Sequence, residues 1–441
     1  MGIKALIINE FDLSLKDGIQ VDIDLCRFFR VECQPLITTV TRERNALLET
    51  NPREIINQLR TFNIDRFNTL KLDISTGIEV IEYIGSYLRS FKSRILTFNT
   101  KLAGKNLTHE YLNSLSKTEV LNKSDLLFIT SEDVENLSNI LGIALKSPNE
   151  LIDLLSKSLN VTRIMLVNHR EGNSYLSITR LSEEEYLEFK TSTYLPKDLI
   201  STYVMIDLTM GADLKESLRN ALDFARKSIE YGVENFGSVI PEVYASSILD
   251  AERYRVINEL SHAVSVIEEN SHLIINLIPE VQMNIAYSLP KHLLRSLGDV
   301  AAIPGRIAKV GNSVKALSHP EFGASKHLAR ALMKVMEYDP KFRSIANIRF
   351  NDSILKAVEK LGYTISSYDR TLEPPEVKYV EGATIPWGVG EAIKKAGFVP
   401  DVIYHKGDYG KEAMIAILGQ NPNDVVRKLL KIGEVLKELA E

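Results

Sequence analysis

The stretch FNTLKLDISTGIEVIEYIGSYLRSFKSRILTFN, residues 67–99, carries the pattern that decides the fold of the first half of the chain. Its apolar run at 67–74 predicts a strand, the segment at 77–91 predicts a helix, and the run at 93–99 predicts another strand. A strand, a helix and a second strand at this spacing form a parallel pair with a crossover helix. The stretch therefore predicts a mostly parallel sheet covered by helices.

The same alternation continues on both sides of this stretch. Further apolar runs typical of buried strands lie at 4–9, 33–41, 124–130 and 163–169. A long amphipathic helix at 212–236 closes this half, and a Pro-containing segment without a clear period follows at 236–250. Another helix, at 252–270, begins a second α/β unit. We therefore predict an α/β protein with two domains, at 1–240 and 250–441.

Composition excludes several classes of protein. The 441 residues include 53 Lys and Arg against 58 Asp and Glu, a net charge of −5, which gives no support for nucleic-acid or membrane-surface binding. The two cysteines, Cys26 and Cys33, are too few for a disulfide framework or a zinc site, and they fit small buried residues in a reducing compartment. No signal peptide or membrane span is apparent, so we expect a cytoplasmic protein.

The stretch EFGASKHLARAL, residues 321–332, predicts a helix with an unusual start. Small residues lead into it, and Lys326, His327 and Arg330 fall in its first two turns. A helix that only packs against a core has no need of three basic side chains at this place. Because free backbone N–H groups and the helix dipole favour negative charge at an N-terminus, the stretch predicts an anion site.

Other polar stretches stand out in the second half, and all but 277–290 contain glycine. They lie at 277–290, 299–314, 347–378 and 400–422. With the motifs PGRIAKV, PEFGASKHLAR, SSYDR, GDYGKEAM and GQNPNDVV in this order, residues 250–441 closely resemble the archaeal-type thiamine-phosphate synthase domain. That domain usually follows a hydroxymethylpyrimidine/phosphomethylpyrimidine kinase. The resemblance implies a transferase that joins hydroxymethylpyrimidine diphosphate to hydroxyethylthiazole phosphate, giving thiamine phosphate and pyrophosphate.

The resemblance also implies roles for individual residues. The family's catalytic Arg and His match Arg306 and His327, and the reaction needs groups that stabilise a departing diphosphate. We expect Arg306 to bind the diphosphate and His327 to donate a hydrogen bond to it or to position the pyrimidine. The remaining candidates for substrate and phosphate binding are Lys309, Ser325, Lys326, Asn284, Glu280, Asp369, Arg370 and Lys411. Magnesium is the expected cofactor, with Asp408 and Glu412 as its candidate ligands.

Each of these assignments has a structural alternative that the sequence leaves open. Arg306 also fits an ion pair, and His327 also fits a hydrogen-bonded structural histidine. The segment 407–412 also fits a turn, and Asp369 and Arg370 also fit a pair with each other.

The first 235 residues resemble a diverged hydroxymethylpyrimidine kinase, which implies a ribokinase-like fold. Gly18, Ile19, Gln20, Asp22, Thr39 and Thr41 match the family's early motif. The family's glycine-rich phosphate loop, however, reads Leu195-Pro196-Lys197-Asp198 here, and proline has no backbone N–H to offer a phosphate. We therefore expect a degenerate kinase-like domain that serves as a scaffold.

Three functions remain open at this stage. The favoured one is a thiamine-phosphate synthase with an inactive kinase-like half. The second is a bifunctional enzyme that still phosphorylates hydroxymethylpyrimidine or its phosphate, and the third is a thiamine-phosphate sensor without catalysis. Kinase-like domains of this type often dimerise, so a homodimer is expected.

Overall fold

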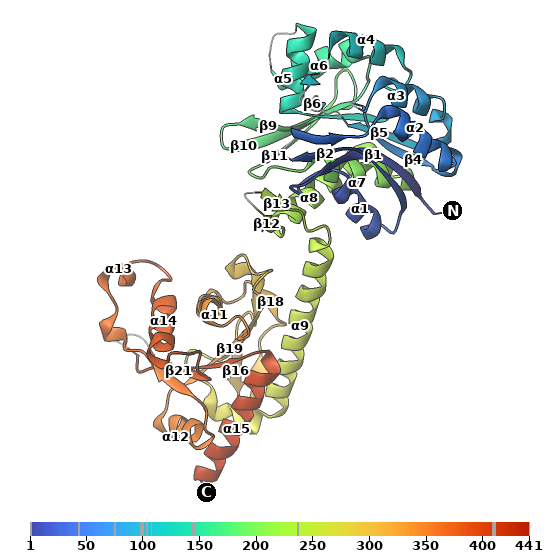
Figure 1. Ribbon diagram of the computed structural model, residues 1–441. Coiled ribbons are helices and arrows are strands. Elements are labelled where there is room, and N and C mark those ends of the chain that lie inside the picture. The colour runs from blue at the N-terminus through green and yellow to red at the C-terminus, as the bar shows by residue number, and fades with distance from the viewer. Residues whose placement is uncertain are drawn as a thin grey trace. The chain divides into compact units, whose positions relative to one another are not determined.

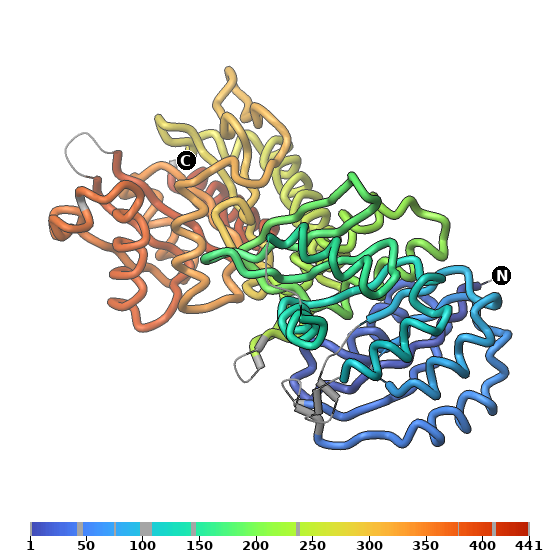
Figure 2. Tube along the Cα trace, turned by 90° about the horizontal axis from the view of Figure 1, so that it is seen from above, coloured from blue at the N-terminus to red at the C-terminus, as the bar shows by residue number. Residues whose placement is uncertain are grey.

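A computed structural model describes residues 2–42, 45–74, 76–97, 101–102, 105–106, 108–142, 147–235, 238–407 and 412–440. The chain divides into two compact units, Met1–Ser246 and Ser247–Glu441. The colour ramp in Figure 2 follows the chain through unit 1 in blue and green and then through unit 2 in yellow to red, so the chain leaves the first unit once. The sequence predicts domains at 1–240 and 250–441, and the division in the structure falls between these two ranges.

Unit 1 is built around a nine-stranded sheet with the order β11-β10-β9-β8-β5-β4-β1-β2-β3. The six strands from β9 to β2 in this order pair in parallel, whereas β10, β11 and β3 are antiparallel to their neighbours. The mostly parallel sheet predicted from sequence is therefore confirmed. The strands are β1 (Lys4–Asp12), β2 (Glu32–Arg42), β3 (Asn45–Glu49), β4 (Thr69–Asp73), β5 (Ser93–Thr97), β8 (Leu126–Thr130), β9 (Ile164–Glu171), β10 (Ser174–Arg180) and β11 (Tyr186–Thr191).

Helices cover both faces of this sheet (Figure 1). In β1, Leu6 and Ile8 point to one face and Ala5 and Ile7 to the other, and all four are fully buried. Helices α2 (Pro52–Thr61), α3 (Ile78–Gly85), α4 (His109–Lys117), α5 (Ser131–Leu141) and α6 (Pro148–Leu159) pack on the first face. Helices α1 (Ile19–Phe28), α7 (Lys197–Met210) and α8 (Leu214–Glu230) pack on the second. Two small hairpins, β6 (Lys101–Leu102) with β7 (Lys105–Asn106) and β12 (Val233–Asn235) with β13 (Ser238–Ile240), lie outside the sheet.

Unit 2 contains a seven-stranded sheet with the order β18-β15-β14-β19-β22-β21-β20. Its strands are antiparallel except for the pair β20 and β21. A separate hairpin, β16 with β17, follows β15. The strands are β14 (Asn284–Ser288), β15 (Val300–Ala302), β16 (Ile307–Val310), β17 (Ser313–Ala316), β18 (Glu321–Phe322), β19 (Ser344–Arg349), β20 (Ile365–Ser367), β21 (Val402–His405) and β22 (Met414–Gly419).

The helices of unit 2 also form two layers. Helices α11 (Lys326–Tyr338) and α14 (Thr384–Ala396) pack against each other on one face, around a core that includes Leu332 and Ile393. Helix α15 (Pro422–Ala440) packs with α12 (Asp352–Lys360) and contacts β19 and β22. At its start, the side chain of Asn421 accepts a hydrogen bond from the backbone N–H of Asp424 at 2.9 Å, which stabilises the first turn. The remaining helices are α9 (Ala245–Glu269), α10 (Ser271–Ile274) and α13 (Pro375–Lys378).

Two predicted boundaries are wrong. The helix predicted at 212–236 ends at Glu230, and Val233–Asn235 form β12. The segment 236–250 is not an irregular linker throughout, because α9 already begins at Ala245 rather than near residue 252. The small residues at 245–247 are compatible with a helix, which the following residues then continue. Among the described residues, no helix combines the length and apolarity that crossing a membrane requires. Cys26 is buried and Cys33 is half-buried, and both are free thiols.

Candidate active site

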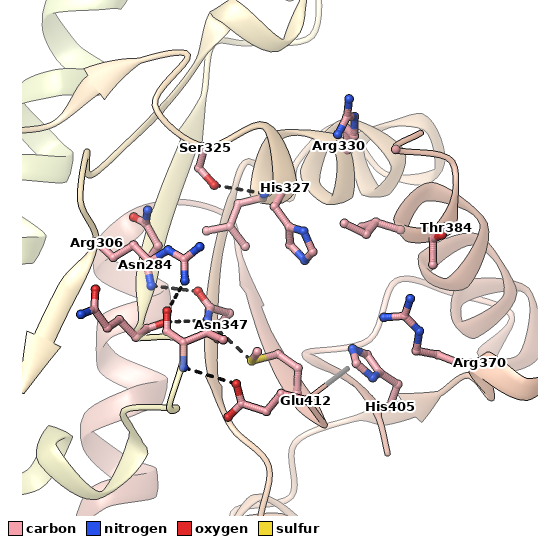
Figure 3. Close-up of a pocket in the computed structure, with 16 residues that line it drawn as sticks. Asn284, Arg306, Ser325, His327, Arg330, Asn347, Arg370, Thr384, His405 and Glu412 are labelled. Atoms are coloured by element: carbon pink, nitrogen blue, oxygen red, sulfur yellow. Dashed lines mark hydrogen bonds between the residues drawn. The ribbon is translucent and has the colours of Figure 1, made fainter. Parts of the chain in front are cut away.

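A cavity of about 500 Å³ lies in unit 2, and Figure 3 shows the side chains that line it. Strands β14, β19, β21 and β22 contribute to its wall, together with the turn before β16, the start of α11 and the segment that leads into α14. The ionisable residues on this wall, among those described, are Arg306, His327, Arg330, Arg370, His405 and Glu412. Five potential cations thus face one carboxylate in a chain whose net charge is negative.

Arg306 reaches the cavity from a tight turn between β15 and β16. Gly305 and Arg306 both have left-handed backbone conformations, with φ angles of 70° and 74°. The backbone N–H of Arg306 donates to the carbonyl of Ile303 at 3.1 Å, and its guanidinium donates to the carbonyl of Val281. A left-handed conformation is uncommon for arginine, and such backbone strain often marks a functional site.

Asn284 supports the segment that leads into this turn. It is 5% exposed, and its side-chain oxygen accepts hydrogen bonds from the N–H groups of Ile303 at 3.0 Å and Ile285 at 2.9 Å. Its amide nitrogen donates to the carbonyl of Ile303 at 2.9 Å. Asn284 lines the cavity, but these bonds mainly fix the backbone two residues before Gly305. Its role in substrate binding stays a prediction.

The start of α11 forms another part of the wall. Ser325 is the N-cap, and its hydroxyl accepts a hydrogen bond from the N–H of Leu328 at 3.4 Å. The imidazole of His327 points into the cavity, as Figure 3 shows. Arg330 lies one turn further along the same helix and also lines the cavity. Two of the three basic residues of the predicted helix start, His327 and Arg330, therefore line the cavity.

Arg370 and His405 lie at the end of the cavity away from Arg306 (Figure 3). Within the described part of the chain, the Nε atom of Arg370 is buried and has no hydrogen-bond partner. The Nδ1 atom of His405 accepts a hydrogen bond from the N–H of Gly407 at 3.1 Å, so the proton of the neutral ring is on Nε2. The ring of Tyr368 packs beside His405, with 5.1 Å between the ring centroids.

The positive charges affect both histidines. Desolvation within the cavity lowers the pKa of His327, and Arg306, Arg370 and Arg330 lower it further. Desolvation, together with Arg370 and His327, lowers the pKa of His405 to about 4. Both rings are therefore mainly neutral near pH 7 when no anion is bound. An anion in the cavity would relieve this repulsion and raise both pKa values.

Glu412 is held by the protein backbone. Its two carboxylate oxygens accept hydrogen bonds from the N–H groups of Glu280 at 3.1 Å and Val281 at 3.4 Å. The described residues contain no group of three or more His, Cys, Asp or Glu side chains that could hold a metal ion. These residues alone therefore do not fit a magnesium site built from protein carboxylates, which is the kind of ligand that Mg²⁺ prefers. Asp408, the other candidate ligand, lies outside the described residues.

The structure brings together six residues that the sequence predicted for one site: Arg306, His327, Ser325, Asn284, Arg370 and Glu412. Lys309 and Lys326 are exposed and are not among the described lining residues. Glu280 contributes its backbone N–H to Glu412, and the carboxylate of Asp369 accepts a hydrogen bond from the backbone of Thr371 at 2.9 Å rather than one from Arg370. Lys411, like Asp408, lies outside the described residues.

Sequence reasoning assigned no role to His405 or Asn347. Both line the cavity, and the side-chain oxygen of Asn347 accepts a hydrogen bond from the N–H of Asn284 at 2.8 Å. The histidine at the end of the apolar run in PDVIYH was the available signal for His405, because polar residues at strand ends often line sites. Asn347 lies within β19 and carried no comparable signal.

A second polar cluster lies in unit 1 and is fully buried. The Nζ atom of Lys71 lies 2.7 Å from an Asp22 carboxylate oxygen and 2.5 Å from an Asp198 oxygen. The N–H of Gly18 donates to the other Asp198 oxygen at 2.8 Å, and Asn9 donates to Asp22 at 3.0 Å. Three residues matched to the kinase motifs, Gly18, Asp22 and Asp198, thus meet around one lysine.

The N-terminus of α7 is occupied by a carboxylate of the chain itself. Asp17 accepts hydrogen bonds from the backbone N–H groups of Lys197 at 3.1 Å and Asp198 at 2.7 Å. Burial and the nearby Asp198 carboxylate raise the pKa of Asp17 well above its usual value. Burial opposes ionisation of Asp198, but Lys71 and Lys197 outweigh it and lower the pKa of Asp198. The helix start that the sequence assigned to a phosphate loop therefore already holds an acidic side chain.

Comparison with known proteins identifies relatives of both units. Residues 259–431 match the family model described as thiamine-phosphate synthase ThiN. A protein named thiamine-phosphate synthase ThiN, from Methanothermobacter thermautotrophicus, is 42% identical over 163 residues, which cover 37% of this chain and 85% of that protein. A protein named bifunctional thiamine biosynthesis protein ThiDN, from Methanocaldococcus jannaschii, is 29% identical over 98% of this chain and 99% of that protein.

Solved structures also match each unit. The C-terminal domain of a phosphomethylpyrimidine kinase is 47% identical, with a TM-score of 0.40, and covers 41% of this chain and 100% of that chain. An ADP complex of Bacillus subtilis pyridoxal kinase is 18% identical, with a TM-score of 0.47, and covers 56% of this chain and 100% of that chain.

Proposed function

The chain belongs to the ThiN family of thiamine-phosphate synthases, and from this premise we propose that the cavity of unit 2 is the site of synthesis. The observation that carries the proposal is the charge of its wall, where, among the described residues, three arginines and two histidines face a single carboxylate. Both substrates of the reaction are phosphorylated, and the leaving group is a diphosphate. A cavity of this size and charge fits such ligands.

In the proposed reaction, the thiazole nitrogen attacks the methylene carbon of hydroxymethylpyrimidine diphosphate. A carbon–nitrogen bond forms, the carbon–oxygen bond to the diphosphate breaks, and the bonding electrons stay on the diphosphate oxygen. The new ring nitrogen becomes positively charged and pyrophosphate leaves with its negative charge. The protein therefore has to stabilise charge that grows on the leaving oxygen.

Arg306 is the proposed partner of that charge. A guanidinium stays ionised at all relevant pH values and binds phosphate oxygens with two parallel hydrogen bonds. Its left-handed turn and the bond to Val281 hold the side chain at the cavity wall before substrate binds. His327, which points into the same space, donates a hydrogen bond to the diphosphate or positions the pyrimidine. Ser325 and the start of α11 add a favourable dipole.

The test is synthesis of thiamine phosphate from the two substrates by the purified chain. Arg306→Ala and His327→Ala are each expected to lower kcat/KM by about 100-fold or more, because removing one group that stabilises a developing charge has this effect. Arg349→Ala is the matched control, since Arg349 is exposed and is not among the described lining residues. If the wild-type chain binds thiamine phosphate but makes no product, the sensor function replaces the synthase.

Magnesium stays a prediction, and no step above depends on it. The described residues do not supply a carboxylate cluster for it, so any requirement is best measured directly. Comparing the synthase activity in EDTA with the activity in added Mg²⁺ decides whether the reaction requires the metal. The homodimer also stays a prediction, which light scattering at several protein concentrations would test.

We propose in addition that unit 1 does not transfer phosphoryl groups. Two contacts support this: Asp17 occupies the N–H groups at the start of α7, and Asp198 is paired with Lys71. A phosphate at that helix start would have to displace the carboxylate of Asp17. A general base needs a carboxylate that is free to accept a proton, and the carboxylate of Asp198 is held by Lys71. Incubation with ATP and hydroxymethylpyrimidine, or its phosphate, is expected to give no ADP and no phosphorylated pyrimidine.

The bifunctional enzyme is the competing function for unit 1. It is favoured by the relative named bifunctional ThiDN, which aligns with nearly the whole chain. ATP-dependent phosphorylation of either pyrimidine by the full chain would establish it and would contradict our proposal. Asp17→Ala is the informative variant in that case, because freeing the start of α7 should increase the activity if Asp17 competes with phosphate there.

A further inference from the structure

Arg370 and His405 take no part in the steps above, although both line the cavity. They come from different elements, since Arg370 follows β20 and His405 ends β21. Because β20 and β21 are parallel neighbours, their carboxyl ends lie at the same edge of the sheet. The fold therefore brings a guanidinium and an imidazole together at one end of the cavity.

Arg370 and His405 both keep hydrogen-bond donors available for a ligand. The Nε atom of Arg370 is buried without a hydrogen-bond partner, and the guanidinium forms no ion pair with a carboxylate of the described residues. Burying an unpartnered donor is unfavourable unless a ligand satisfies it. His405 uses Nδ1 to accept from Gly407, which leaves the Nε2 hydrogen to donate elsewhere. An anion is the ligand that two such donors share.

This end is distinct from the end formed by Arg306. Figure 3 shows Arg306 and Arg370 on opposite sides of the His327 imidazole, and both arginines act on the pKa of that ring. The two substrates together carry a diphosphate and a monophosphate, which cannot occupy the same place. The diphosphate is attached to the reacting methylene carbon, whereas the thiazole phosphate is separated from the reacting nitrogen by part of the ring and a two-carbon arm.

We infer that Arg370 and His405 form the subsite for the phosphate of the thiazole substrate, while the Arg306 end takes the diphosphate. The inference rests on the proposed synthase function and names the residues that make the enzyme prefer a phosphorylated thiazole. Binding of this phosphate satisfies the buried Nε of Arg370 and the Nε2 hydrogen of His405. It also holds the thiazole nitrogen at a fixed distance from the diphosphate end, which favours attack on the methylene carbon.

The experiment compares hydroxyethylthiazole phosphate with hydroxyethylthiazole, the alcohol that lacks the phosphate. The ratio of their kcat/KM values is measured for the wild type, Arg370→Gln and the control Arg349→Gln. We expect Arg370→Gln to lower the preference for the phosphate by about 10- to 100-fold, the usual effect of removing a hydrogen bond between charged groups. Arg349→Gln should keep the wild-type ratio.

Two His405 variants separate binding from support of the local turn. Asn at this position keeps an acceptor for the N–H of Gly407 but has no donor at the place of Nε2, whereas Gln keeps that donor. We expect His405→Asn to lose the preference for the phosphate and His405→Gln to retain most of it. The reverse order would assign His405 to the turn and remove it from the subsite.

The outcomes distinguish this inference from the proposed function. A wild-type chain without product refutes the synthase, and calorimetric titration of thiazole phosphate into wild type and Arg370→Gln then still tests the subsite. Product formation with an unchanged phosphate preference in Arg370→Gln refutes the subsite alone. A raised KM for the pyrimidine diphosphate in that variant, with the preference for the thiazole phosphate unchanged, would instead assign the diphosphate to the Arg370 end and the thiazole phosphate to the Arg306 end.

Discussion

Replacing Lys71 with methionine tests whether the buried cluster of unit 1 is an internal ion-pair network rather than catalytic machinery. The Nζ atom lies 2.7 Å from Asp22 and 2.5 Å from Asp198, and none of the three side chains is more than 3% exposed. Methionine keeps an unbranched chain of similar length but removes the charge. Two buried carboxylates then lose their shared counter-ion.

The expected loss is large. Removing one partner of a buried ion pair costs about 3–5 kcal/mol. The two pairs do not add fully, because Asp22 keeps its hydrogen bond from Asn9 and one of two facing carboxylates can take up a proton. We therefore expect unit 1 to lose about 3–5 kcal/mol at pH 7, a large fraction of the roughly 5–15 kcal/mol of a typical domain.

The structure also determines how the stability difference between Lys71→Met and the wild type changes with pH. In the wild type the pKa of Asp198 is lowered, so its contribution to stability is present above the unfolded pKa and is lost in strong acid. In the variant, the pKa of Asp22, already raised by burial, rises further once Lys71 is gone. A raised carboxyl pKa favours the folded state at low pH, so the difference between variant and wild type shrinks as the pH falls from 7 toward 4.

The assay uses the position of the only tryptophan. Trp387 lies in unit 2, so its fluorescence follows that unit during urea unfolding, whereas far-ultraviolet circular dichroism follows both units. Lys71→Met should shift a circular dichroism transition and leave the tryptophan transition in place. Adding Asp22→Asn and Asp198→Asn should restore most of the stability. A loss below about 1 kcal/mol in Lys71→Met would refute the network, since breaking a buried pair costs more than that.

Three further predictions concern unit 2. Asn284→Ala leaves the N–H groups of Ile303 and Ile285 unsatisfied, and we expect a loss of about 3 kcal/mol by tryptophan-monitored urea unfolding, together with lower kcat. The folded pKa of His405 is about 4 against about 6.5 when unfolded, so unit 2 should lose up to about 3 kcal/mol between pH 6.5 and 4, and His405→Gln should flatten this profile. Pyrophosphate at 100 times its Kd should stabilise unit 2 by about 2.7 kcal/mol, and salt should weaken this effect; no shift of the tryptophan transition would contradict the anion site.

The parallel sheet of unit 1 could be predicted because its strands are buried on both faces. Such strands contain continuous apolar runs, as in β1 and β8, and they stand out from the helices between them. In unit 2 the sequence indicated α/β structure but not the largely antiparallel order of its sheet. Strand pairing there depends on contacts between segments far apart in the chain, such as β14 with β19 and β19 with β22.

Residues of the site could be predicted where a single stretch of sequence contained a recognisable motif. Arg306 and His327 lie in motifs whose composition already indicated phosphate chemistry, and both line the cavity. Whether a neighbouring residue also lines the cavity depends on the direction in which it projects from the helix. Lys326 and His327 differ by about 100° around α11, and of these two only His327 lines the cavity. The role of Arg370 depends on His405, 35 positions later in the chain, and no local pattern joins the two.

The two units treat a helix N-terminus in opposite ways, and the contrast bears on what each can do. At the start of α7, the backbone N–H groups are already bonded to Asp17, and the nearby lysine is already paired with two aspartates. Because these donors already have acidic partners within the chain, an incoming phosphate would gain few new interactions there. At the start of α11, by contrast, desolvation and the repulsion from neighbouring cations of the cavity lower the pKa values of both histidines. An anionic substrate relieves that repulsion on binding, so part of its affinity originates in cavity cations that have no ion-pair partner among the described residues. Catalysis of pyrophosphate release needs this second arrangement, because only charges that are not already neutralised can respond to the charge that develops on the leaving group.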